Sequence, residues 1–133
     1  MEPQEDAAEP KYDLEDRLID FASRVIDVAE ALPNTRAGNH VAGQLVRCGT
    51  SPMANHAEAQ GGESRDDFIH KIRVGQKELR EVRVWLKLVR RKAYITPDQD
   101  LTSLLSECDE LIAIFVTSVR TAERNRAARK ATR

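Results

Sequence analysis

The chain has 133 residues, of which 32% are charged and 5% aromatic, and its formal net charge is −1. Abundant Ala, Leu, Val, Arg and Glu, with few glycines and prolines, predict one all-α domain. No apolar run approaches the roughly 20 residues of a membrane span, and the acidic start MEPQEDAAEPK lacks the apolar core of a signal peptide. We therefore expect a cytoplasmic protein that makes no membrane contact.

The small net charge conceals a strong asymmetry along the chain. Residues 1–16 hold seven acids and one base, residues 71–92 hold nine bases and two acids, and residues 120–133 hold six bases and one acid. Only local patches could therefore contact phosphates, whereas nucleic-acid-binding domains are usually basic overall. We predict an acidic disordered tail at 1–11, a folded domain at 12–122 and a basic disordered tail at 123–133.

The first predicted helix begins after the acidic tail and ends before Pro33. Its apolar residues alternate steps of four and three, the spacing of one face of a bundle helix. They are Leu14, Leu18, Phe21, Val25, Val28 and Leu32. Acids crowd its first turn, where the helix dipole favours negative charge.

The second predicted helix spans about residues 35–60, and its apolar spacing continues through Pro52. A proline inside a helix removes one backbone hydrogen bond and costs about 3 kcal/mol. The hydroxyls of Thr50 and Ser51 could satisfy freed carbonyls, and Gly49 would let another helix approach closely. We therefore predict a kinked, closely packed helix here and not a loop that carries chemistry.

Five polar residues recur every three or four positions on this helix: Gln44, Arg47, Ser51, Asn55 and Glu58. They could line a ligand pocket, or they could form a buried hydrogen-bonded network that fixes helix pairing. We favour the structural network.

The third predicted helix starts at the N-cap Ser64, with an acid three residues later at Asp67. Its apolar positions are Phe68, Ile72, Gly75, Leu79, Val82, Leu86, Val89 and Ala93. The fourth helix begins at Thr96-Pro97-Asp98-Gln99, where Thr96 caps, Pro97 occupies the first helical position and Gln99 reaches back to the cap. Its apolar positions are Leu101, Leu104, Cys108, Leu111 and Phe115.

Four helices joined by short connections predict an antiparallel up-down-up-down four-helix bundle. Several apolar residues of the third and fourth helices fall outside the core positions, and one bundle cannot easily bury both sides of a helix. They are Ile69, Val84, Trp85, Leu88 and Ile114. We expect them to form the interface of a homo-oligomer.

A basic stripe lies opposite the apolar positions of the third helix. It consists of Arg73, Lys77, Arg80, Lys87 and Arg91, flanked by Arg83 and Arg90. The stripe could neutralise phosphates in a sequence-independent, salt-sensitive way. Alternatively, it is a solvated face that pairs with acids of neighbouring helices, such as Asp20, Asp27, Asp109 and Glu110.

No constellation indicates catalysis, a cofactor or a metal. His40, His56 and His70 are too far apart in sequence to share one helix face. Cys48 and Cys108 sit inside apolar patterns without a C-x-x-C spacing, so we interpret them as buried hydrophobic residues.

The run from Gln44 to Leu88 resembles the 23S rRNA intervening-sequence proteins, which are four-helix bundles. The residues that carry the resemblance are Gln44, Leu45, Arg47, Ser51, Asn55, Ala57, Glu58, Ser64, Asp67, Phe68, Ile69, Glu78 and Trp85. The resemblance covers roughly residues 12–122 and implies a homopentamer around a central channel. A related branch, the accessory protein of diversity-generating retroelements, partners a reverse transcriptase and binds nucleic acid.

These observations lead to two functional hypotheses. The first is a non-catalytic, homo-oligomeric accessory or adaptor protein that binds RNA or DNA through the basic stripe and the C-terminal tail. The second is a protein-interaction scaffold that binds no nucleic acid.

Overall fold

A computed structural model describes residues 13–62, 64–96 and 98–132, without the side chain of Gln99. It contains α2 (Leu14–Ala31), α3 (Arg36–Gln60), α4 (Arg65–Arg91) and α5 (Asp98–Thr132), and no strand in the described ranges. The predicted all-α, four-helix architecture is confirmed. The predicted acidic tail and the capping roles of Pro97 and Gln99 lie outside the described residues.

Each of the first three helices begins with the side-chain cap that local sequence favours. The carboxylate of Asp13, the hydroxyl of Thr35 and the hydroxyl of Ser64 accept from backbone N–H groups three residues later, at 2.9, 2.9 and 3.0 Å. Such caps satisfy donors that the first turn of a helix leaves unpaired, and each contributes about 1 kcal/mol.

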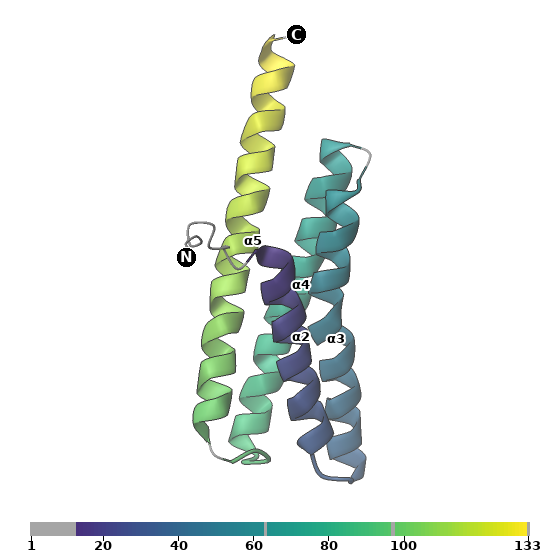
Figure 1. Ribbon diagram of the computed structural model, residues 1–133, viewed down its shortest axis with the longest axis vertical. Helices are drawn as coiled ribbons and strands as arrows, with labels where there is room; N and C mark the ends of the chain where they lie inside the picture. The colour runs from purple at the N-terminus through teal and green to yellow at the C-terminus, as the bar shows by residue number, and fades with distance from the viewer. Residues whose placement is uncertain (1–12, 63, 97, 133) are drawn as a thin grey trace, which may run out of the picture.

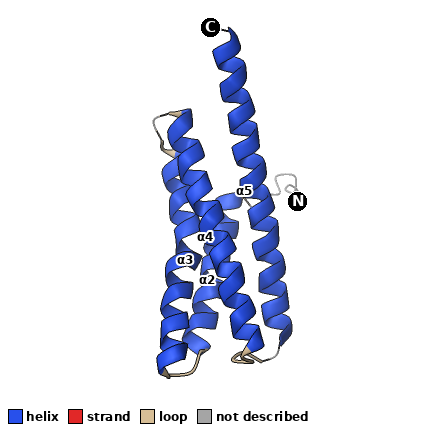
Figure 2. Ribbon diagram, turned by 180° about the vertical axis from the view of Figure 1, so that it is seen from behind, coloured by secondary structure: helices blue, strands red, loops and turns tan. Residues whose placement is uncertain are grey.

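The helices pack in a ring in which each contacts its neighbours in the chain and α2 also contacts α5. Figure 1 shows short connections at alternating ends of the bundle, with α2 beginning about midway along its neighbours. Figure 2 shows the same elongated, all-helical body from behind, with α5 extending past the other helices at one end. The end of the bundle beyond α2 therefore consists of three helices.

The core follows the predicted apolar positions of all four helices. Its largest fully buried side chains are Phe21, Phe115, Leu18, Leu45, Ile72, Leu79, Leu86, Leu101, Leu104, Leu111, Val25 and Val82. Burying a side chain of this size contributes roughly 1.5–3 kcal/mol, so this shared core is what holds the helices together.

Helix α3 continues without interruption through Pro52, as predicted. The Thr50 hydroxyl donates to the carbonyl of Val46 at 2.8 Å, one turn earlier, and the Asn55 amide donates to the Ser51 carbonyl at 3.0 Å. Pro52 itself is buried. The carbonyl that loses its helical donor at Pro52 is that of Cys48, four residues earlier, and both of these side-chain bonds go to other carbonyls.

Two helix ends differ from the sequence predictions. Helix α4 stops at Arg91, and Ala93 lies beyond it with φ 56°, so that the Tyr94 amide can donate back to the Val89 carbonyl at 3.2 Å. A residue in this left-handed conformation is a common way to end a helix.

The second difference is at the C-terminus. The predicted disordered tail from residue 123 is wrong in the described range, because α5 continues to Thr132. Alanines and arginines are strong helix formers, and ion pairs from Glu123 to Arg73 and from Arg126 to Asp66 tie this extension to α4.

Candidate nucleic-acid interface

The basic stripe of α4 separates into two sets in three dimensions. Arg73, Arg83 and Arg90 form ion pairs with Glu123, Asp109 and Asp98 of α5. The distances for the last two pairs are 2.7 and 3.0 Å. These three arginines are therefore partly neutralised at the α4–α5 contact.

The other four cations of the stripe make no ion pair with any described residue. They are Lys77, Arg80, Lys87 and Arg91, and all four are exposed. At positions i, i+3, i+10 and i+14 they lie on one side of the helix. We call this surface the α4 outer face, and it is where α4 could contact a polyanion.

The predicted acidic partners were only partly right. Asp109 does pair with Arg83, but Glu110 pairs with Arg17 of α2 at 3.0 Å. Neither Asp20 nor Asp27 forms an ion pair within the described residues. The sequence could not assign these pairs because they depend on how neighbouring helices are rotated and aligned.

The apolar residues predicted for an oligomer interface also separate. Val84 is 63% exposed and Leu88 is 38% exposed, and both lie among the cations of the α4 outer face. Trp85 and Ile114 are partly buried against the core. Ile69 is buried in the core, at 3% exposure, so its assignment to an interface was wrong.

The predicted polar network of α3 is present only in pieces, and most of it is not buried. Arg47, with a side chain 51% exposed, donates to Glu78 at 3.1 Å, to Gln44 at 3.2 Å and to Glu81. The Trp85 indole N–H donates to the same Glu81 at 3.1 Å. The hydrogen bonds from Trp85 and Arg47 lower the pKa of Glu81. The cluster therefore connects α3 to α4 through an arginine and two carboxylates.

The remaining members of the predicted network lie apart from Arg47. Asn55 donates to the hydroxyl of Ser51 at 2.9 Å within α3. Glu58, 60% exposed, accepts from Lys71 of α4 at 2.7 Å. The expectation that the network helps to pair helices holds for Arg47 and Glu58, but the expectation that it is a buried, continuous unit was wrong, because this edge of the helix is open to solvent.

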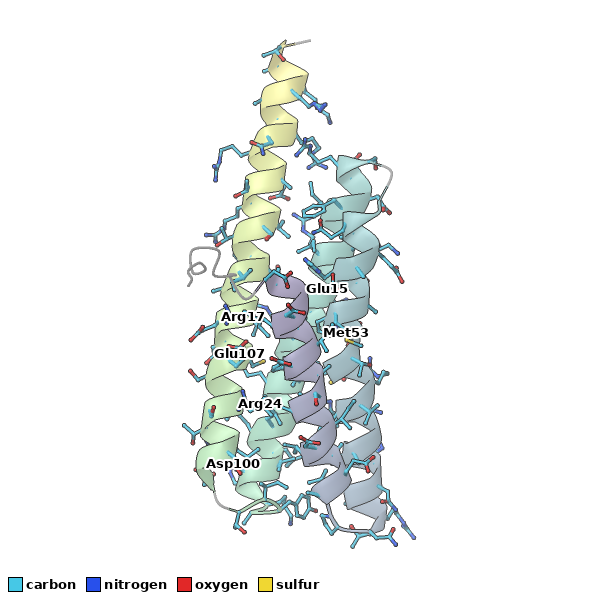
Figure 3. The ribbon with its side chains drawn as sticks, viewed as in Figure 1. Glu15, Arg17, Arg24, Met53, Asp100 and Glu107 are labelled. Carbon is cyan, nitrogen blue, oxygen red and sulfur yellow. The ribbon has the colours of Figure 1, made fainter. Side chains whose placement is uncertain are left out.

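An ion-pair cluster between α2 and α5 was missed by the sequence reasoning. Arg17 donates to Glu107 at 2.7 and 3.0 Å and to Glu110 at 3.0 Å, and Figure 3 shows Arg17 and Glu107 side by side between these helices. The pKa of Arg17 is raised, mainly by its hydrogen bond to Glu107. An arginine at the edge of an apolar face was the available signal, but its partners are about 90 residues away in the chain.

The histidines do not converge. His40 meets Trp85 edge to face at 5.9 Å between ring centroids, whereas His56 is buried beside Phe115 at 6.5 Å and its pKa is lowered by burial. His70 is exposed on α4. Within the described ranges, no group of three His, Cys, Asp or Glu residues could hold a metal ion.

Both cysteines are free and buried, as the sequence predicted. Burial raises the pKa of each thiol to about 12, so neither Cys48 nor Cys108 is a ready nucleophile near neutral pH. None of the described helices is long and apolar enough to cross a membrane.

Comparisons with known proteins agree with this architecture. Residues 11–117 match the family described as 23S rRNA-intervening sequence protein. A crystal structure of a protein of unknown function from the S23 ribosomal protein family of Bacteroides thetaiotaomicron is also similar. It shares 31% sequence identity and a TM-score of 0.73, over 79% of this chain and 96% of that one. No curated protein is significantly similar.

The family match covers most of the chain, and the similar crystal structure aligns with 79% of it. The chain therefore belongs to the 23S rRNA-intervening sequence protein family.

Proposed function

We propose that this protein is a non-catalytic, homo-oligomeric accessory protein that binds RNA or DNA through the α4 outer face. The observation that carries the proposal is the set of four exposed cations on this face with no acidic partner among the described residues. A helix of 27 residues is about 40 Å long, so phosphates of one nucleic-acid strand could contact several of these cations. Such contacts release counterions and give salt-dependent binding.

We also propose that neighbouring helices of the bundle run antiparallel and that several copies of the bundle assemble into a homo-oligomer. By resemblance to its family, the protein forms a homopentamer in the cytoplasm, where it acts alongside a nucleic-acid enzyme such as a reverse transcriptase. Ile114 lies on an outward face of α5 together with Ala113, Thr117 and Thr121, around a shallow hollow of about 340 Å³. Assembly through this face would leave the α4 outer face accessible in every copy.

Binding of labelled single-stranded RNA and DNA across a salt series tests the proposal. In the double variant Arg80→Gln/Lys87→Gln, two phosphate contacts are lost, so the slope of log K against log salt should become shallower by about 1.4. The matched control Arg73→Gln/Arg83→Gln removes the same charge from cations already paired with α5. Its slope should stay unchanged; equal slopes in all three proteins, or no binding at low salt, refute the proposal.

A specific observation favours a second candidate, a protein-interaction scaffold. Val84 and Leu88 expose apolar surface between the cations of the α4 outer face, and charged surfaces with apolar centres are typical of protein interfaces. One face cannot be covered by a protein and also bind nucleic acid. If the α4 outer face mediates assembly, Val84→Ser/Leu88→Ser will reduce the mass measured by sedimentation while the helical circular dichroism is retained.

A further inference from the structure

The end of the bundle beyond α2 contains a groove with cationic edges. Arg17 of α2 pairs with Glu107 and Glu110, so the start of α2 is level with this part of α5. The 22 residues of α5 after Glu110 continue for about 33 Å past that level. Figure 1 shows α3, α4 and α5 at this end of the bundle, whereas α2 does not reach it.

We call this region the end groove and define it by its lining. Ala59, Phe68 and Ala122 provide apolar surface in a hollow of about 440 Å³, and Arg65 and Arg129 line the same hollow. An adjoining hollow of about 470 Å³ shares both arginines and adds Arg126 and Lys130.

Among the described residues, most of the cations that line the end groove have no ion-pair partner. Arg126 is paired with Asp66 and lowers the pKa of that carboxyl. Arg65, Arg129 and Lys130 have no ion pair within the described residues. The groove therefore suits an acidic segment with small apolar side chains.

We infer that the acidic N-terminal segment of this chain, residues 1–12, docks in the end groove. The segment contains Glu2, Glu5, Asp6 and Glu9 against Lys11, with Ala7 and Ala8 between the acids. It ends directly before the Asp13 cap of α2. Twelve residues reach up to about 40 Å when extended, which is enough to follow α5 to its end.

Covalent attachment strengthens the argument for this occupant over a separate acidic partner. A short tether gives an effective concentration on the order of millimolar, so weak exposed ion pairs suffice for substantial docking. The inference stands independently of nucleic-acid binding, because it concerns α5 and the turn between α3 and α4, away from the α4 outer face.

Carbodiimide cross-linking tests the inference, because the reagent joins a carboxylate directly to a neighbouring lysine amine. Lys130 is the lysine of the end groove. After trypsin digestion, a peptide of residues 1–11 joined to residues 130–133 identifies the contact by mass. Lys130→Arg keeps the charge but removes the amine, so it must abolish that product. We expect the link at Lys130 to exceed the link at the exposed Lys77.

Two further experiments test whether the groove arginines promote the link and whether the link forms within one chain. Arg65→Gln/Arg129→Gln should reduce the Lys130 product about threefold, as expected for losing two exposed ion pairs. Arg80→Gln/Arg91→Gln, the same charge change outside the groove, should leave it unchanged. In co-refolded mixtures of ¹⁴N and ¹⁵N chains, the two peptides of each linked product should both carry ¹⁴N or both carry ¹⁵N, because the link forms within one chain.

Three results would overturn the inference. They are the absence of the Lys130 product, equal linking at Lys77 and Lys130, and a product that joins peptides of different isotopes at the statistical frequency. The last result would assign the groove to the segment of another copy. Failure of nucleic-acid binding would leave all of these outcomes unaffected, so the two proposals can fail separately.

Discussion

Helices α2 and α3 approach each other closely at Gly49 of α3, and this contact leads to a sharp prediction. A Cβ atom at this position would lie 2.6 Å from Cγ1 and 3.0 Å from Cβ of Val25 in α2. Carbon atoms in ordinary contact are about 3.5–4.0 Å apart. Because the Cβ of Val25 is attached directly to its backbone, Gly49→Ala must push the two helices apart.

Gly43 on the same helix is the matched control, since nothing lies within 4 Å of a Cβ placed there. Gly43→Ala should raise the free energy of unfolding by about 1 kcal/mol, because alanine is the better helix former. Gly49→Ala gains the same propensity, but overpacking a buried site costs about 1–3 kcal/mol. The two variants should therefore differ by about 1–3 kcal/mol, with Gly49→Ala the less stable.

Guanidinium denaturation followed by circular dichroism, at one fixed chain concentration, measures both values. Adding Val25→Ala to Gly49→Ala makes room for the new methyl group. The double variant should thus be more stable than the sum of the two single changes predicts. If Gly49→Ala stabilises the protein as much as Gly43→Ala does, the close approach of α2 and α3 is refuted.

Three other substitutions have clear expected outcomes. Burial lowers the pKa of His56 from its usual 6.5, and Glu15 and Asp13 oppose the shift. As the pH falls, the unfolded chain therefore binds the proton before the folded chain does. The contribution of His56 to the free energy of unfolding should be fully present above pH about 6.5 and should be lost as the pH drops through the folded pKa. His56→Gln should remove that share of the decline, and an unchanged pH dependence in denaturant titrations would contradict it. Ala93→Gly should raise the melting temperature, because the left-handed conformation at φ 56° costs alanine about 1 kcal/mol; a lower melting temperature would show that the conformation is not strained. Glu58→Ala should change stability by less than the error of a denaturant titration, since this ion pair is mostly exposed, and a large loss would indicate a buried role.

Much of the fold followed from local chemistry that the sequence contains. The spacing of Leu18, Phe21 and Val25 predicts which side of α2 is buried, and these residues are indeed in the core. Ser64 starts α4 because its hydroxyl can reach an N–H three residues later in the same turn. Both features depend only on helix geometry, so no knowledge of neighbouring helices is needed.

The candidate site could be predicted only as a set of residues, and the tertiary structure decided which of them remain available. Arg83 and Lys87 belong to the same basic stripe, but only Arg83 meets an acid of α5, while Lys87 stays exposed. Likewise, Ile69 is a core residue, although the pattern of its own helix placed it outside the core positions. Helical periodicity gives the direction of a side chain from its own axis, whereas the partner it meets depends on the register and crossing angle of packed helices. Those quantities come from the fit of whole surfaces, and no single stretch of sequence contains them.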